Sequence, residues 1–160
     1  MPNLPFMIAH GCYYAALGLW IGMMAMLAVG ARVAFDTLPE KRAAGDLVGT
    51  WLAKYYRMGA LFAVVAAVGA ILRFSMAEQS LWKDVALTPW TPQRWIAFTR
   101  YLLLGFMIMI HLYAGWSLDP EVKRLKAIPE AAEVFRALHA REVLLLGANL
   151  LAGIVVIFLS

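Results

Sequence analysis

Four long blocks of apolar residues dominate this sequence, and they constrain the fold more than any other feature. Each is long enough to cross a hydrocarbon layer of ~30 Å as an α-helix, which takes roughly 20 residues. The chain is 63% hydrophobic and 15% charged, against roughly 45–50% and 25% in soluble domains. A water-soluble fold could not bury that much apolar surface. The sequence therefore predicts one all-α domain over residues 1–160, an integral membrane four-helix bundle, with helices at about 5–35, 55–76, 95–118 and 130–160.

Proline and tryptophan positions predict where the chain leaves the membrane. Pro39 disfavours helical geometry in the residue before it, so the first helix should end there and a loop should follow. Asp119-Pro120 predicts the end of the third helix. Several indoles and prolines fall within residues 78–94, and indoles favour the boundary between lipid and water. We expect this segment to lie along the membrane surface.

The basic residues predict the orientation, because short loops rich in Lys and Arg stay in the cytoplasm. The side with the termini carries four of them: Arg73, Lys83, Arg94 and Arg100. The opposite side carries ten: Arg32, Lys41, Arg42, Lys54, Arg57, Lys123, Arg124, Lys126, Arg136 and Arg141. The sequence thus predicts a bacterial inner (cytoplasmic) membrane protein with both termini on the periplasmic or external side. The loop at 119–141 should be cytoplasmic and the segment at 78–94 external.

Polar residues inside apolar blocks are costly, so they are the candidates for a functional site. Arg100 and His111 are eleven residues apart, which places them within about 20° of one helix face. His139, Glu142 and Asn149 form a second polar stripe at helical spacing. We expect an interhelical hydrogen bond for Asn149 and an ion pair with a neighbouring arginine for Glu142. The ligand or cofactor candidates are His10, Arg100, His111, His139, Glu142 and Asn149.

Gly18 and Gly22 form a GxxxG pair in the first block, a spacing that lets another helix approach closely. We expect these two glycines to serve in packing.

Three histidines in a bundle raise the alternative of a b-type haem or metal-binding redox protein, since facing imidazoles at matched depth can ligate iron. The helical positions place His10 near one membrane face, His111 about 10 Å inside the other end of its helix, and His139 at or outside that boundary. These unequal depths favour no cofactor, and no metal site is predicted. The single cysteine, Cys12, excludes an internal disulfide and a c-type haem attachment motif.

Other function classes lack support in the sequence. No nucleophile elbow, phosphate loop or metalloprotease motif occurs, so no enzymatic activity is predicted. The net charge of +4 comes from basic residues interleaved with Asp and Glu, which is not typical of a nucleic-acid surface. The partners predicted are the lipid bilayer and other membrane-protein subunits.

Five short motifs, in order, resemble a four-helix membrane family that includes the eukaryotic transmembrane protein 205. They are Leu19-Trp20-Ile21-Gly22, Phe35-Asp36-Thr37-Leu38-Pro39, Ala44-Gly45, Tyr55-Tyr56-Arg57 and Phe135-Arg136-Ala137-Leu138-His139. The resemblance implies the four-helix topology and carries no settled activity. The function expected is therefore that of a non-enzymatic multi-pass membrane protein, either an accessory subunit of a membrane complex or a small-molecule handling protein.

Overall fold

The computed structural model describes residues 4–83 and 89–160. Within those residues, four helical segments are long and apolar enough to cross a membrane: Leu4–Thr37, Lys41–Trp82, Pro92–Lys126 and Pro129–Phe158. The chain is all-helical apart from turns and short connections in this described part. Large apolar side chains point outward, among them Met26, Leu144 and Phe158. Surfaces of this kind are stable in lipid rather than in water, which indicates a multi-pass membrane protein.

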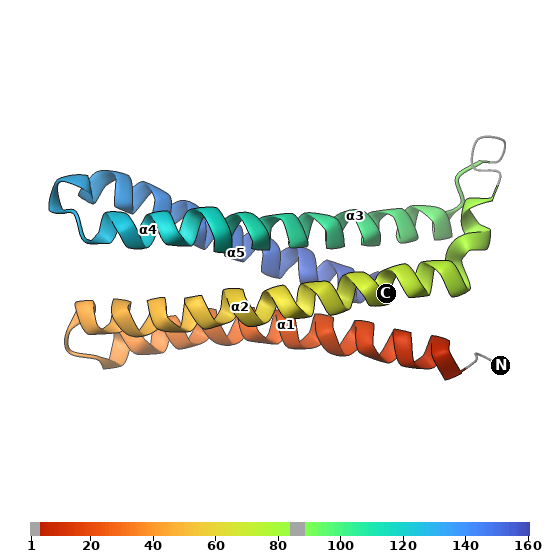
Figure 1. Ribbon diagram of the computed structural model, residues 1–160, viewed down its shortest axis with the longest axis horizontal. Helices are drawn as coiled ribbons and strands as arrows, with labels where there is room; N and C mark the ends of the chain where they lie inside the picture. The colour runs from red at the N-terminus through yellow and green to blue at the C-terminus, as the bar shows by residue number, and fades with distance from the viewer. Residues whose placement is uncertain (1–3, 84–88) are drawn as a thin grey trace.

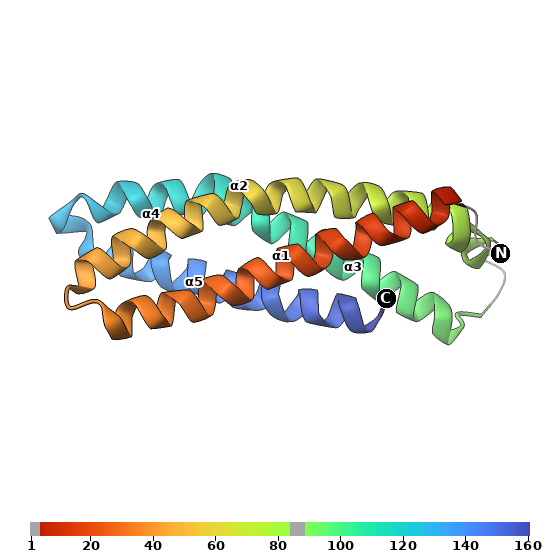
Figure 2. The same ribbon diagram turned by 90° about the horizontal axis from the view of Figure 1, so that it is seen from below.

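The bundle consists of two antiparallel helix pairs lying along one common axis (Figures 1 and 2). The first pair is α1 (Leu4–Thr37) and α2 (Lys41–Arg73). The second is α3 (Pro92–Tyr113), which continues into α4 (Asp119–Lys126), with α5 (Ala132–Phe158) running back along it. Both pairs turn at the same end of the molecule (Figure 1), which we call the turn end. α1 begins and α5 ends toward the opposite end, which we call the terminal end (Figure 1).

Glycines set the close contacts between helices, though not the two that the sequence singled out. A Cβ at Gly69 of α2 would lie 2.9 Å from the Tyr13 Cβ of α1, and one at Gly153 of α5 would lie 2.7 Å from Ile21. By contrast, no atom of the described residues outside the helix backbone lies within 4 Å of a Cβ added at Gly18 or Gly22. The described helices of this bundle therefore do not use the GxxxG pair for packing, because its face of α1 points outward, and its packing role stays a prediction.

The second span starts earlier than the predicted residue 55. α2 begins at Lys41, directly after the break at Pro39, because the segment predicted as a loop is amphipathic and packs on α1. Ala44 and Leu52 are buried, and so is Ala34 on the opposite helix. The helix also runs past the predicted residue 76, through a π-helical turn (Phe74–Glu78) and a 3₁₀ turn (Gln79–Trp82).

α3 begins at Pro92 because Thr91 caps it. The threonine side chain accepts a hydrogen bond from the Arg94 backbone N–H at 3.3 Å, and proline is well tolerated in a first turn. The predicted end at Asp119-Pro120 is wrong. A wider π-helical turn (Ala114–Leu118) precedes Pro120, so the proline again lies in a first turn and the helix continues to Lys126. Of the predicted surface segment 78–94, residues 84–88 lie outside the described part of the chain.

The last span follows a 3₁₀ turn (Pro129–Ala131) and agrees with the predicted region.

The apolar part of α2 lies between Arg57 and Arg73, whereas the whole span to Trp82 has 42 residues, or about 63 Å at 1.5 Å per residue. A hydrocarbon layer of ~30 Å covers only about half of that length. Most of the excess lies at the turn end, before Arg57.

Candidate functional site

Two adjacent tyrosines on α2 connect all four spans near the middle of the bundle. Neighbouring residues of a helix point about 100° apart, so buried Tyr55 and Tyr56 face different partners. The Tyr55 hydroxyl accepts a hydrogen bond from Trp20 Nε1 of α1 at 3.3 Å. The Tyr56 hydroxyl donates to Glu142 Oε1 of α5 at 3.1 Å. His111 of α3 packs against both tyrosine rings, with ring centroids 5.2 and 5.5 Å away.

The hydrogen bonds of His111 fix which nitrogen carries the proton in the neutral ring. Nε2 lies 2.9 Å from the Tyr56 backbone carbonyl, which can only accept, so Nε2 donates. Nδ1 therefore accepts from the Tyr55 hydroxyl at 3.3 Å. The ring fits because residue 59 is glycine, where an added Cβ would lie 2.3 Å from His111 Cε1. Both nitrogens are engaged, so iron ligation by His111 would first have to break these bonds.

Glu142 is the central acidic group of the site, and its side chain is only 1% exposed. Its Oε1 accepts the Tyr56 hydrogen bond. Its Oε2 lies 3.5 Å from His139 Nδ1 and makes no hydrogen bond within the described chain. The predicted arginine partner is wrong: in residues 4–83 and 89–160, no Lys or Arg forms an ion pair with this carboxylate. A buried carboxylate without a cation is costly, which marks this position for a role beyond packing.

Two neighbouring cavities share Glu142 in their walls. One, of about 300 Å³, lies between α1, α2 and α5 and is mainly apolar. The other, of about 350 Å³, lies at the turn end and has several basic side chains. Their common lining residues are Val48, Leu52, His139 and Glu142. Both volumes fall at the lower end of the range for small-molecule pockets, ~300–1,000 Å³.

Asn149 lies about two helical turns after Glu142 on the predicted polar stripe, and it is 1% exposed. Its amide lies near the Tyr55 hydroxyl, but neither Oδ1 nor Nδ2 makes a hydrogen bond with a described residue. The interhelical hydrogen bond predicted for Asn149 is therefore not formed. Leaving buried polar atoms without hydrogen bonds is costly, so this amide also needs an explanation beyond packing.

The three histidines occupy three different surroundings. His10 stacks on Phe6 and packs edge-on against Tyr14, toward the terminal end. His139 is half exposed and stacks on Phe135. No group of three or more His, Cys, Asp or Glu with metal-binding geometry occurs in the described residues. The structure thus does not bring the histidines together.

Arg100 belongs to a second polar cluster, at the terminal end, although it shares a buried face of α3 with His111 as predicted. It pairs with Glu78 Oε2, and Arg73 donates from Nε to Glu78 Oε1 at 2.9 Å. Tyr101 also donates to Oε2, at 2.8 Å. Arg73 donates further to the Tyr14 hydroxyl at 3.1 Å. This cluster ties α1, α2 and α3 together with its acidic member neutralised by two arginines.

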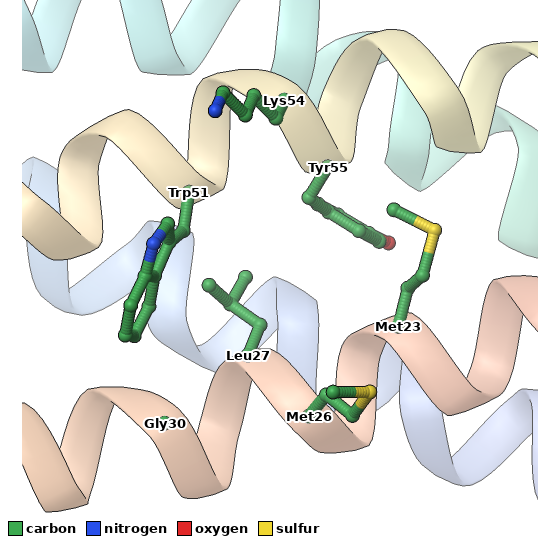
Figure 3. A pocket seen from close by; sticks show the side chains of 7 residues that line it. All are labelled: Met23, Met26, Leu27, Gly30, Trp51, Lys54 and Tyr55. Carbon is green, nitrogen blue, oxygen red and sulfur yellow. The ribbon is translucent and has the colours of Figure 1, made fainter.

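A further groove opens between α1 and α2 on the outer surface, with a volume of about 370 Å³. Figure 3 shows Leu27 and Met23 from α1 facing Trp51 and Tyr55 from α2 across it. Trp51 packs against Gly30, where an added Cβ would lie 3.0 Å from the indole. Apart from Lys54 and the Tyr55 hydroxyl the lining is apolar, so this groove offers less chemistry than the cavities at Glu142.

Sequence reasoning identified Glu142, His111 and Asn149 but missed Tyr55, Tyr56 and Trp20. A signal existed for the tyrosines: two adjacent phenols at the start of an apolar block are amphipathic groups that need a hydrogen-bond partner once buried. Glu78 was missed because it lies outside the predicted second helix. Glu78 lies five residues after Arg73, and it pairs with Arg73 because the helix continues through the π-helical turn.

Comparison with known proteins places the chain in a family without indicating its activity. Residues 15–131 match the family model described as Domain of unknown function (DUF4149). The match covers most of the chain, and the protein belongs to that family. No curated protein matches significantly, and neither does any solved structure.

Proposed function

We propose that this protein handles a small lipophilic molecule within the membrane, bound between the helix pairs at Glu142. The observation that carries the proposal is a fully buried carboxylate oxygen, Glu142 Oε2, without a hydrogen bond at the common wall of two cavities. A folded bundle gains nothing from burying such a group. A bound molecule could use it, because pockets of this kind combine apolar walls with a few placed polar groups.

The chemistry of the site supports binding rather than catalysis. His111 and the two tyrosines are held in a closed set of hydrogen bonds, so they orient one another and Glu142. The Tyr56 bond fixes the carboxylate and leaves Oε2 for a ligand. Among the described residues that line the two cavities, there is no nucleophile activated by a neighbouring base. We therefore keep the non-enzymatic interpretation.

A cavity-filling variant tests the proposal. The protein would be purified from native membranes in mild detergent, and bound small molecules would be identified by mass spectrometry. Leu146→Trp should remove a co-purifying molecule, because Leu146 lines the apolar cavity. Leu144→Trp is the matched control, since Leu144 is 71% exposed on the same helix. Equal ligand content in the wild type and in folded Leu146→Trp would contradict the proposal.

The same purification separates the two rival interpretations. A stable stoichiometric protein partner without a bound small molecule would favour an accessory subunit of a membrane complex. A Soret band lost in His111→Ala would favour a b-type haem protein. We expect neither result. We also propose that the chain is related to the four-helix membrane proteins that include the eukaryotic transmembrane protein 205.

We further propose that the turn end faces the cytoplasm of a bacterial-type cell and that the terminal end is external. The ten basic residues toward the turn end, against four toward the terminal end, support this orientation. Single cysteines placed at Lys126 and at Gln79, in a Cys12→Ala background, test it with a membrane-impermeant thiol reagent in intact cells. Labelling at Gln79 but not at Lys126 is expected. The reverse pattern would overturn the orientation.

A further inference from the structure

The cavity at the turn end has more basic than acidic groups at its rim. Two of its cations are already compensated: Lys126 Nζ lies 2.5 Å from Asp46, and Lys123 Nζ lies 2.6 Å from Asp119. The other two, at the start of α2, form no ion pair within residues 4–83 and 89–160. Arg42 lies one helical turn before Asp46, but the Asp46 carboxylate forms its ion pair with Lys126. The four basic lining residues are Lys41, Arg42, Lys123 and Lys126.

The N-terminus of α2 lies at the same rim and is electrostatically unbalanced. Lys41 and Arg42 are its first two residues, no acidic residue occurs in its first turn, and Glu40 provides no side-chain cap. Cations at the positive end of a helix dipole are the reverse of the favourable arrangement. Free backbone N–H groups and two cations at one helix start are complementary to an anion.

The basic cavity and the apolar one share Leu52, His139 and Glu142 in their walls, and we call this shared wall the neck. Beyond the neck, Met24, Leu27, Leu146 and Leu150 line an apolar cavity between α1, α2 and α5. The unbonded Oε2 of Glu142 lies at this neck. Basic side chains thus line the cavity on one side of the neck, and apolar side chains line the cavity on the other side.

We propose that the ligand is an anionic amphiphile with a single apolar chain and a phosphate monoester or free carboxylate head, rather than a neutral or cationic one. This inference rests on the proposed function. The anionic head lies at the start of α2 with Lys41 and Arg42, and the chain passes Glu142 into the apolar cavity. Glu142 Oε2 accepts a hydrogen bond from a hydroxyl group that the ligand carries between head and chain. One apolar cavity adjoins the opening, and it accepts one chain.

The test uses the full chain in phosphatidylcholine nanodiscs, with empty nanodiscs subtracted. Tetradecyl phosphate and tetradecyltrimethylammonium would be compared by equilibrium binding, because they share a chain and differ in head charge. We expect saturable binding of the phosphate that is about tenfold or more tighter and weakens with salt. The double variant Lys41→Gln/Arg42→Gln should lose about tenfold in affinity for the phosphate. Arg32→Gln is the control, since Arg32 is exposed and lies outside the cavity.

Each further outcome decides one claim. Loss of all binding in Leu146→Trp with no effect of Lys41→Gln/Arg42→Gln would overturn the anionic head and keep the proposed function. Unchanged binding in both variants would overturn both proposals. Binding of inorganic phosphate as tight as that of tetradecyl phosphate would show a site for a free anion, and competition by phosphatidylglycerol in the disc would show a two-chain lipid. Either of these results would overturn the single-chain amphiphile.

Discussion

The two polar clusters of this bundle each bury a glutamate, and they differ in how the charge of that glutamate is compensated. At the terminal end, Glu78 is bonded by Arg73, Arg100 and Tyr101, so its charge is compensated where it is buried. Toward the turn end, Glu142 has only a tyrosine hydroxyl and a half-exposed histidine. A cluster whose charges are compensated is sufficiently explained as a structural clamp between helices. An uncompensated one lowers stability unless something else binds there, and this difference separates structure from function in the bundle.

The largest effect is expected for Glu78→Gln. The substitution would leave buried Arg100 and partly buried Arg73 without their carboxylate, and breaking a buried pair costs about 3–5 kcal/mol. Thermal unfolding in detergent, followed by circular dichroism, measures the loss. Glu121→Gln serves as the control, because its pair with Arg124 is exposed and exposed pairs contribute ~0–1 kcal/mol. Equal stability of the two variants would show that the terminal cluster is not a clamp.

Gly59→Ala should have the next largest effect, because it displaces the imidazole that orients the Glu142 cluster. The new Cβ would lie 2.3 Å from His111 Cε1, and overpacking of this kind costs about 1–3 kcal/mol. Gly105→Ala is matched to it, since nothing lies within 4 Å of a Cβ at Gly105. If both variants unfold at the wild-type temperature, the contact between α2 and α3 at His111 is not tightly packed.

Asn149→Leu should change the free energy of unfolding by no more than about 1–2 kcal/mol, and toward higher stability. The wild-type amide has two unsatisfied atoms in the described structure, so leucine removes a burial cost and no hydrogen bond. Thermal unfolding of the ligand-free protein tests this. A large loss of stability would mean that the amide is bonded in the membrane. Normal stability with loss of ligand would assign Asn149 to the binding site.

Glu142→Gln should cause the smallest loss of stability, leaving the ligand-free protein unchanged or more stable, because it removes a buried charge that no Lys or Arg compensates. Glutamine keeps an oxygen for the Tyr56 hydroxyl and loses only the contact to His139, whose side chain is half exposed. Ligand retention, measured by mass spectrometry beside Glu133→Gln on the exposed part of α5, should nevertheless fall. A stability loss as large as that of Glu78→Gln would remove the contrast between the two clusters.

The sequence predicted the four spans because hydropathy depends on composition alone. It predicted that Arg100 and His111 share an inward face because helical periodicity is regular over eleven residues. The ends of α2 and α3 could not be predicted, since they depend on tertiary packing: Ala44 is buried only because α1 lies beside it, and a π-helical turn places Pro120 in a first turn. The Tyr56 to Glu142 bond joins residues 86 apart, a pairing that no local pattern contains.

The unequal overhang of the helices has a consequence for where a ligand comes from. The second span is about 63 Å long, about twice a hydrocarbon layer of ~30 Å, and the neck at Glu142 is bonded to Tyr56, next to Arg57 where the apolar part of α2 begins. A molecule bound there would have its chain in the adjacent leaflet and its head in the adjoining water, without crossing the bilayer midplane. Exchange would then follow the composition of one leaflet alone, so the protein would sample an asymmetric membrane from one side.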